Sequence, residues 1–142
     1  MHILVLNGPN LGLLGQREPE LYGRETLADV EARLRKKHPS TSFTFVQSNH
    51  EGSIVDELNK AATGAFDGVV INPGAYAHSS YAIRDAVAAA DIPVVEVHIT
   101  NVHAREEFRR LSVIASVCTG VVAGLGTRVY DLAVQFLVER TP

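Results

Sequence analysis

Cysteine and lysine are both scarce in this sequence of 142 residues, and each shortage excludes a class of chemistry. The single cysteine, Cys118, cannot form an intramolecular disulfide or a multi-cysteine metal site, and its apolar neighbours favour a small core residue. Only Lys36, Lys37 and Lys60 are lysines among 13 basic residues, and all three fall on predicted helices. A catalytic lysine that forms a Schiff base is therefore not expected.

Long apolar runs and a large excess of one charge are also missing. The formal net charge of −3 leaves no basic field to hold a nucleic-acid backbone or an anionic membrane. No apolar stretch of about 18 residues is present to form a transmembrane helix. The first residues lack the basic region and the small-residue cleavage site of a signal peptide. We expect a cytoplasmic protein with no membrane and no nucleic-acid partner.

What the sequence does contain is the composition of one globular domain. Apolar residues make up 46% and charged residues 20%, as in ordinary globular proteins. A chain of this length buries roughly two thirds of its unfolded surface, which is enough for a real core. No repeat, linker or low-complexity tract divides it, so we predict one domain over residues 1–142.

Short β-type runs alternate with amphipathic helical runs along the chain. Strands are predicted within residues 3–6, 43–46, 69–71, 93–97 and 113–123. Helices are predicted after the N-caps Thr26, Ser53 and Ser79 or Ser80, and over residues 104–110 and 127–139. This alternation predicts a three-layer α/β fold whose parallel sheet has helices on both faces. For five strands the commonest arrangement is flavodoxin-like, with strand order 2-1-3-4-5.

Polar side chains collect after three of these strands. They are Asn7, Asn10 and Arg17 after the first strand, Asn72, Tyr76 and His78 after the third, and Glu96, His98, Thr100 and Asn101 at the fourth. In the predicted order these strands are neighbours, and ligands bind beyond the carboxyl ends of parallel strands. We therefore expect one cleft that holds amides, imidazoles and an arginine.

The segment 8–24 is rich in glycine and proline and shows no sustained helical or strand period. Structureless segments of this length are uncommon in compact domains and are often lids, although a solvated surface loop is the alternative. Arg17 and Tyr22 lie five residues apart in it. A guanidinium favours the phenolate form of a nearby tyrosine, so this pair suggests a strong base on a lid.

Several other motif readings fail. The glycines of residues 8–15 and 124–126 lack the spacing of a dinucleotide-binding fingerprint, and neither a phosphate-binding loop nor a nucleophile elbow is present. His98 and His103 do not have the spacing of a helical zinc site, so no metal is expected. What remains is acid–base chemistry without a cofactor, for which His98 and His78 are candidates.

Seven short motifs give the chain a resemblance to a known family. The motifs that carry it are LNGPNLGLLG (6–15), REPELYG (17–23), QSNHEG (47–52), INPGAYAHSS (71–80), RDA (84–86), EVHITN (96–101) and REEFR (105–109). Over nearly its whole length the chain resembles type II 3-dehydroquinate dehydratase, a shikimate-pathway enzyme of aromatic amino acid biosynthesis. The resemblance implies a single flavodoxin-like catalytic domain with an active-site lid within residues 8–24. It also implies a cofactor-free hydro-lyase that converts 3-dehydroquinate to 3-dehydroshikimate through an enolate.

The resemblance also implies roles for five side chains. Tyr22 corresponds to the general base that removes a proton next to the ketone. Arg17 corresponds to the cation that stabilises the phenolate and the developing charge. Asn10 corresponds to the residue that holds a water against the enolate. His98 corresponds to the general acid that protonates the departing hydroxyl, and Glu96 orients its ring.

Substrate binding and assembly are further implications of the resemblance. The groups that resemble binding residues for the anionic substrate are Asn72, His78, Ile99, Thr100 and Arg109. Asp85 corresponds to a residue that reaches the active site of a neighbouring subunit in a trimer, and four such trimers form a dodecamer. From the residues alone, Asp85 is a solvated helix charge.

The two alternatives to an enzyme are a binding module and a regulatory switch. A non-catalytic flavodoxin-like module that binds a small anion or nucleotide at helix N-termini explains the glycine-rich segment and the serine caps. It does not explain why arginine, tyrosine and two histidines gather at one predicted edge. A response-regulator-like switch needs an acidic cluster after the first strand, where this chain has Asn7 and Asn10.

Overall fold

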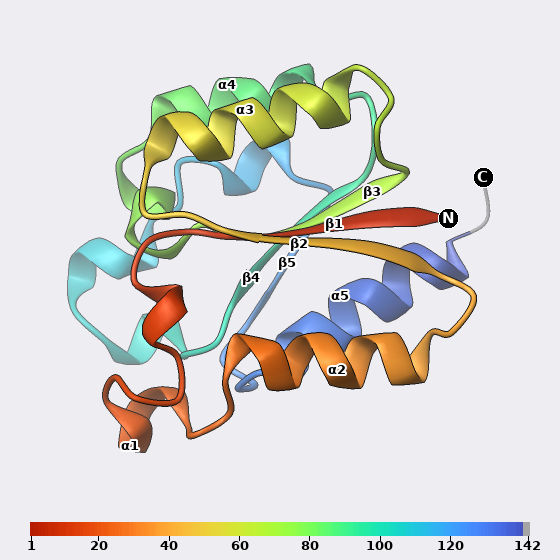
Figure 1. Ribbon diagram of the computed structural model, residues 1–142. Coiled ribbons are helices and arrows are strands. Elements are labelled where there is room, and N and C mark those ends of the chain that lie inside the picture. The colour runs from red at the N-terminus through yellow and green to blue at the C-terminus, as the bar shows by residue number, and fades with distance from the viewer. Residues whose placement is uncertain (141–142) are drawn as a thin grey trace.

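Five parallel strands form the middle layer of the structure, a computed structural model that describes residues 1–140 (Figure 1). They are β1 (His2–Asn7), β2 (Ser42–Gln47), β3 (Gly68–Asn72), β4 (Val94–His98) and β5 (Gly120–Ala123). Their order in the sheet is β2-β1-β3-β4-β5, which confirms the predicted flavodoxin-like topology. Residues 141 and 142 of the predicted domain lie outside the described part of the chain.

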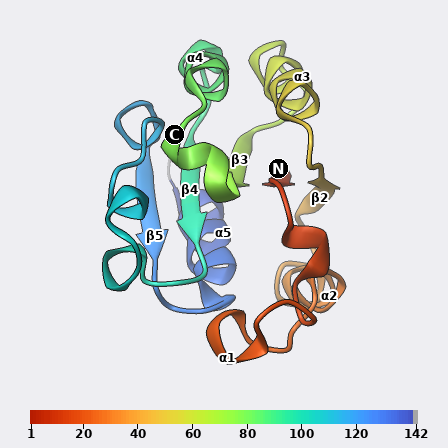
Figure 2. The same cartoon turned by 90° about the vertical axis from the view of Figure 1, so that its left-hand side faces the viewer.

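Helices cover both faces of the sheet. α3 (Glu51–Ala62) and α4 (Tyr81–Ala89) pack on one face, and α2 (Leu27–Lys37) and α5 (Arg128–Glu139) on the other (Figures 1 and 2). Because β3 and β4 are buried on both sides, their sequences are apolar runs in which Asn72, Glu96 and His98 are the polar residues. Within residues 1–140, none of the helices is both long and apolar enough to cross a membrane.

The predicted helix starts are only partly correct. Thr26 forms a capping box with Asp29 at the start of α2, and Ser80 Oγ accepts the Ile83 backbone N–H at the start of α4. Ser53 is not an N-cap, because α3 begins two residues earlier with His50 in extended backbone before Glu51. An acidic residue in the first turn stabilises a helix N-terminus, which favours the earlier start.

The predicted helix over residues 104–110 is two separate 3₁₀ turns. η3 (Val102–Ala104) and η4 (Glu107–Arg110) are interrupted by Arg105, whose backbone is extended. The Asn101 side chain accepts the His103 N–H and so caps the first turn. A single turn fixes several dihedral angles for few hydrogen bonds, so local sequence alone predicts such turns poorly.

The segment 8–24 is more ordered than its composition predicts. It contains the 3₁₀ turn η1 (Leu11–Leu13) and the one-turn helix α1 (Pro19–Tyr22). Leu11 is buried in the hydrophobic core, and Gly15 has a φ of +92°. A Cβ at Gly15 would lie 2.8 Å from the Arg24 carbonyl oxygen, so glycine permits the close approach that brings these two points of the segment together.

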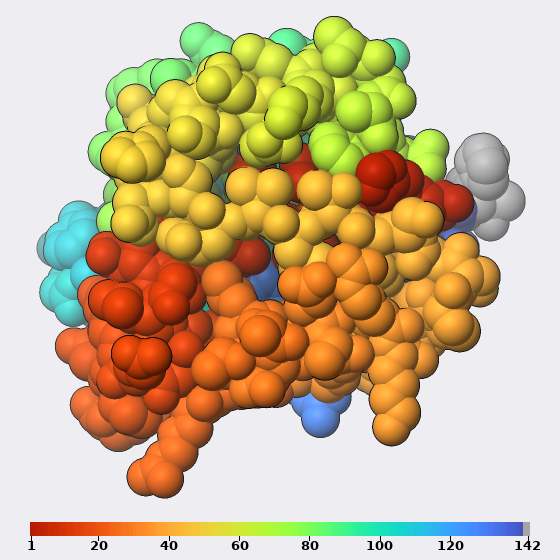
Figure 3. All heavy atoms as spheres, in the orientation of Figure 1, coloured from red at the N-terminus to blue at the C-terminus, as the bar shows by residue number. Residues whose placement is uncertain are grey.

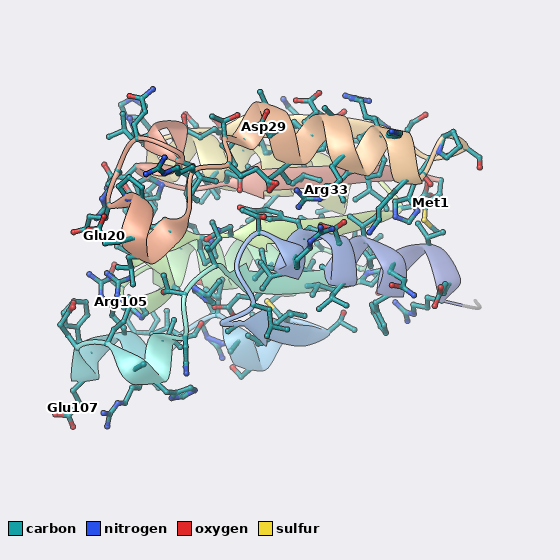
Figure 4. All side chains as sticks on the ribbon, turned by 90° about the horizontal axis from the view of Figure 1, so that it is seen from below. Met1, Glu20, Asp29, Arg33, Arg105 and Glu107 are labelled. Atoms are coloured by element: carbon teal, nitrogen blue, oxygen red, sulfur yellow. The ribbon has the colours of Figure 1, made fainter. Side chains whose placement is uncertain are left out.

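A charged network joins the residue after this segment to helices α2 and α5. Arg33 Nη2 donates to Asp131 Oδ2 at 2.7 Å, and Lys37 Nζ donates to Asp131 Oδ1 at 2.8 Å. Arg33 also pairs with Glu25, which accepts the Thr127 hydroxyl. Figure 4 shows Arg33 between the two helices. Burial of Asp131 opposes its ionisation, but the hydrogen bonds from Arg33 and Lys37 outweigh this and hold its pKa below the ordinary value.

Replacing Asp131 with asparagine should destabilise the fold at neutral pH. The carboxylate is 6% exposed while Lys37 is half exposed, so the expected loss is about 2 kcal/mol, less than for a fully buried ion pair. Because the folded-state pKa of Asp131 is lowered, its contribution is complete above about pH 3.8 and is lost as the pH falls through the folded-state value. Urea midpoints at pH 7 and pH 3, at fixed protein concentration, measure this difference.

Glu31 provides a matched control on α2, the helix that carries Arg33 and Lys37. It pairs with Arg35 at 2.9 Å, but both side chains are more than a third exposed. Glu31→Gln should therefore change stability by less than about 0.5 kcal/mol. Equal urea midpoints for wild type and Asp131→Asn at pH 7 would contradict a stabilising role for the network.

Candidate active site

The carboxyl ends of β1, β3 and β4 open into one pocket. Figure 2 looks onto this edge of the sheet. The backbone explains why they converge. Asn7 pairs with Asn72 in the β1–β3 register, and the Gly8 N–H donates to the Asn72 carbonyl at 2.8 Å. A Cβ at Gly8 would lie 2.5 Å from the Pro73 carbonyl oxygen, so only glycine allows the two loops to touch.

Nine of the eleven predicted site residues line this pocket. They are Asn10, Arg17, Tyr22, Asn72, His78, His98, Ile99, Thr100 and Arg109. Residues 8–24 and the segment after β4 form its outer walls, seen as red-to-orange and cyan atoms along one side of Figure 3. Of the other two, Glu96 lies behind His98, and Asp85 lies exposed on α4 and is not part of the pocket lining.

His98 and Glu96 form a buried pair. They are two residues apart on β4 and so point to the same side of the sheet. His98 Nε2 lies 2.6 Å from Glu96 Oε1, and Glu96 is completely buried. A carboxylate only accepts hydrogen bonds, so Nε2 carries the proton of this contact when Glu96 is ionised. Within residues 1–140, Nδ1 has no hydrogen-bond partner, and His98 lines the pocket.

Two arginines surround Tyr22. The guanidinium carbons of Arg17 and Arg105 each lie 5.4 Å from the centre of the tyrosine ring. Arg105 Nη1 also donates to the Tyr22 hydroxyl oxygen at 2.9 Å, a contact that stabilises a phenolate. In Figure 4, Arg105 lies beside α1, which carries Glu20 and Tyr22. Sequence reasoning paired Tyr22 with Arg17 alone, although the RxxxR spacing of residues 105–109 at the same edge was a usable signal.

A buried hydroxyl fixes the amide of Asn72. Asn72 Nδ2 donates to the Tyr130 hydroxyl at 2.9 Å, and that hydroxyl donates to Asn7 Oδ1 at 2.5 Å. Asn72 Oδ1 accepts the Gly74 N–H at 3.3 Å. Burial raises the pKa of Tyr130 far above its ordinary value, so the hydroxyl stays neutral and serves as both donor and acceptor. Sequence reasoning missed Tyr130. It lies on α5 and reaches Asn7 and Asn72 from the face of the sheet that α2 and α5 cover.

His78 and Arg109 line the pocket, and each has a polar partner that does not line it. The Leu111 carbonyl oxygen lies 2.8 Å from His78 Nδ1 and can only accept, so Nδ1 carries a proton. The His78 and His98 rings are stacked with 6.5 Å between centres. Arg109 Nε donates to Glu106 at 2.6 Å, and this charge-assisted bond lowers the pKa of the Glu106 carboxyl.

The single cysteine fits the predicted core role. Cys118 is partly buried against the apolar cluster between the sheet and helices α3 and α4. Burial and the charge of Glu96 raise its pKa to about 12, which leaves the thiol protonated and a poor nucleophile near neutral pH. Among the described residues, no three His, Cys, Asp or Glu side chains are grouped closely enough to hold a metal ion.

The model of the family Dehydroquinase class II matches residues 1–138 of this sequence. The chain belongs to this family. A 3-dehydroquinate dehydratase of Bacillus licheniformis is 55% identical over 140 residues, covering 97% of this chain and 96% of its own. A 3-dehydroquinate dehydratase of Bacillus subtilis is 51% identical over 141 residues, covering 98% and 95%.

Solved structures agree with this membership of the class II dehydroquinase family. The crystal structure of a type II dehydroquinase from Butyrivibrio crossotus has a TM-score of 0.94 and 46% identity, covering 98% of both chains. A 3-dehydroquinate dehydratase-like protein from Bifidobacterium longum is more distant, with a TM-score of 0.71 and 26% identity over 99% of both chains. The predicted family and fold are therefore confirmed.

Proposed function

We propose that this chain is a type II 3-dehydroquinate dehydratase, a hydro-lyase that forms 3-dehydroshikimate without a cofactor in the shikimate pathway. The observation that carries this is one pocket lined by a tyrosine held by arginine and a histidine backed by a buried carboxylate. An elimination next to a ketone needs a base, an enolate stabiliser and an acid. Relatives of this chain at 51–55% identity bear the name 3-dehydroquinate dehydratase.

Tyr22 is the proposed base. Its hydroxyl accepts from Arg105, and the Arg17 guanidinium lies over its ring, so two positive charges lie next to the group that removes the proton. The phenolate takes the proton next to the substrate ketone, and the electron pair of that C–H bond moves into the enolate. Arg17 also faces the charge that develops in the transition state.

Asn10 is the proposed enolate stabiliser. Its backbone is left-handed, with a φ of +67°, and its N–H donates to Asn49 Oδ1 at 3.0 Å. Asparagine tolerates this conformation better than most residues. The constraint fixes the Asn10 side chain at the pocket wall, where its amide holds the water that donates to the enolate oxygen.

His98 is the proposed acid, with Glu96 as its positioning partner. The protonated ring donates Nε2–H to Glu96 and keeps Nδ1–H for the pocket. When the enolate collapses, the carbon–oxygen bond of the neighbouring hydroxyl breaks, and the oxygen takes this proton and leaves as water. The overall reaction is the loss of one water molecule from the substrate, and it needs no metal, oxidant or reductant.

The remaining predicted residues are proposed to bind the anionic, hydroxylated substrate. Arg109 supplies a charged fork for a carboxylate, His78 and Asn72 supply oriented polar groups, and Ile99 and Thr100 lie at the rim of the pocket after β4. Residues 8–24 are proposed to act as the lid of a single catalytic domain. Asp85, exposed on α4, is proposed to complete the active site of a neighbouring subunit. The proposed assembly is a dodecamer built from four trimers. The proposed location is the cytoplasm.

Direct turnover tests the proposed function against a pure binding module. Mixing pure protein with 3-dehydroquinate should produce the ultraviolet absorbance of a conjugated enone, and borohydride added with substrate should not inactivate it, because no imine forms. Folded protein with no signal above background would overturn the proposal. Retention of a flavin or a phosphate compound through purification would favour the binding module instead.

A further inference from the structure

Ser112 contacts the buried pair of the site from outside the pocket. Its hydroxyl donates to Glu96 Oε1 at 2.7 Å, the same oxygen that His98 Nε2 contacts at 2.6 Å. Ser112 is partly buried, in the segment between η4 and η5 (Ala115–Val117). It does not line the pocket, so it has no direct access to the substrate.

The direction of the Ser112 hydroxyl is fixed by its other contacts. A serine hydroxyl has one hydrogen to donate and two lone pairs to accept with. Its oxygen accepts the backbone N–H groups of Ile114, at 3.3 Å, and Ala115, at 3.2 Å. With both lone pairs engaged, the hydrogen points to Glu96 Oε1. The backbone thus sets Ser112 as a constant donor to this carboxylate.

Glu96 depends strongly on this donor. The carboxylate is completely buried, and its second oxygen, Oε2, has no partner within the described residues. The titratable groups that face it are the His98 imidazole and the Cys118 thiol, which is neutral because burial and the Glu96 charge raise its pKa to about 12. Within residues 1–140, Ser112 is therefore the one side chain besides His98 that donates to Glu96. Donation from Ser112 fixes the plane of the carboxylate.

We propose that Ser112 is a positioning residue that holds Glu96, and through it the His98 ring, in the orientation needed for proton donation. This proposal rests on the proposed role of His98 as the general acid. It adds a third member to the pair, and it places that member on a different segment from β4. The expected signature is an effect on the chemical step and on its pH dependence, with substrate affinity unchanged.

Two variants of equal shape separate the hydroxyl from the packing. Ser112→Thr keeps the hydroxyl and Ser112→Val replaces it with a methyl group. We expect the valine variant to lose about tenfold in kcat, the size of one charge-assisted hydrogen bond, with KM within about twofold of wild type. The pH dependence of its kcat should also differ from that of wild type, because the buried carboxylate that holds His98 has lost its neutral donor. The threonine variant should stay near wild type in both measures.

Ser116 is the matched control, since it is exposed on η5 and its hydroxyl has, within residues 1–140, a single hydrogen bond, from Arg84 at 3.3 Å. Ser116→Ala should leave kcat and the pH profile unchanged. If Ser112→Val fails to fold, Ser112→Ala removes the hydroxyl without adding volume and takes its place. Equal kcat values and equal pH profiles for the hydroxyl-retaining and hydroxyl-lacking variants would overturn the proposal.

A second readout does not depend on turnover. With ¹⁵N-labelled histidine, the His98 ring resonances, assigned by their loss in His98→Asn, report the proton and hydrogen bond on each ring nitrogen. Wild type and Ser112→Thr should agree, and Ser112→Val should differ. If wild type fails to convert 3-dehydroquinate while these spectra behave as expected, the proposed function fails and the positioning role stands. Identical spectra in all three proteins would overturn the positioning role.

Discussion

Tyr22→Phe should abolish turnover of 3-dehydroquinate while substrate still binds. The substitution removes only the hydroxyl that Arg105 contacts and leaves the ring between two guanidinium groups. Without the phenolate no group is left to take the proton, so we expect kcat to fall by at least about a thousandfold, within the range of general-base catalysis. Substrate binding to the variant, followed by calorimetry, should stay within about tenfold of wild type, because Arg109 and His78 are untouched.

Tyr81 provides the control for this substitution. It is 68% exposed on α4 and has no part in the pocket, so Tyr81→Phe should turn over substrate at the wild-type rate. Activity near wild type in Tyr22→Phe would reject Tyr22 as the base. Loss of both binding and activity would instead indicate that the hydroxyl mainly organises the pocket.

His98→Ala should lose several orders of magnitude in kcat and stall the reaction after the first proton transfer. The base and the enolate stabiliser remain, so the variant should still exchange the proton next to the ketone with D₂O, whereas Tyr22→Phe should not. A loss below about tenfold, equal to about 1.4 kcal/mol, would make His98 peripheral. Absence of exchange in His98→Ala would contradict a separate enolate step.

Two further variants show whether the loss is specific to the buried pair. His103→Ala removes an exposed imidazole five residues away and should be neutral. Glu96→Gln keeps the shape of the carboxyl group but not its charge, so the ring loses the anion that stabilises its protonated form. We expect Glu96→Gln to lose activity, but less than His98→Ala.

The fold was predictable because the signals for its strands and helix caps lie in short stretches of sequence. Buried parallel strands such as β3 are short apolar runs that end in polar residues, and the capping box at Thr26 is a sequence pattern with a direct physical cause. The convergence of Asn10, Asn72 and His98 followed from strand order alone. The start of α3 and the one-turn helix α1 were missed, because packing rather than propensity decides such boundaries.

The residues that were missed at the site share one property, which is their distance along the chain from the groups they contact. Arg105 is 83 residues from Tyr22, and Tyr130 is 123 residues from Asn7. Ser112 reaches Glu96 from a segment with no secondary-structure signal of its own. Pattern reasoning places side chains at an edge of the sheet, but which hydroxyl meets which carboxylate depends on packing that only the three-dimensional structure gives.

The anchoring of the segment 8–24 has a thermodynamic consequence. Leu11 and Leu14 are buried, the Arg17 and Tyr22 N–H groups are already bonded within the segment, and the ion pair of Glu25 and Arg33 holds its far end. Ordering a free backbone costs about 1–2 kcal/mol per residue, so a segment that is already folded gives up little entropy when a ligand binds in the pocket beside it. Binding energy is then not consumed in folding this segment.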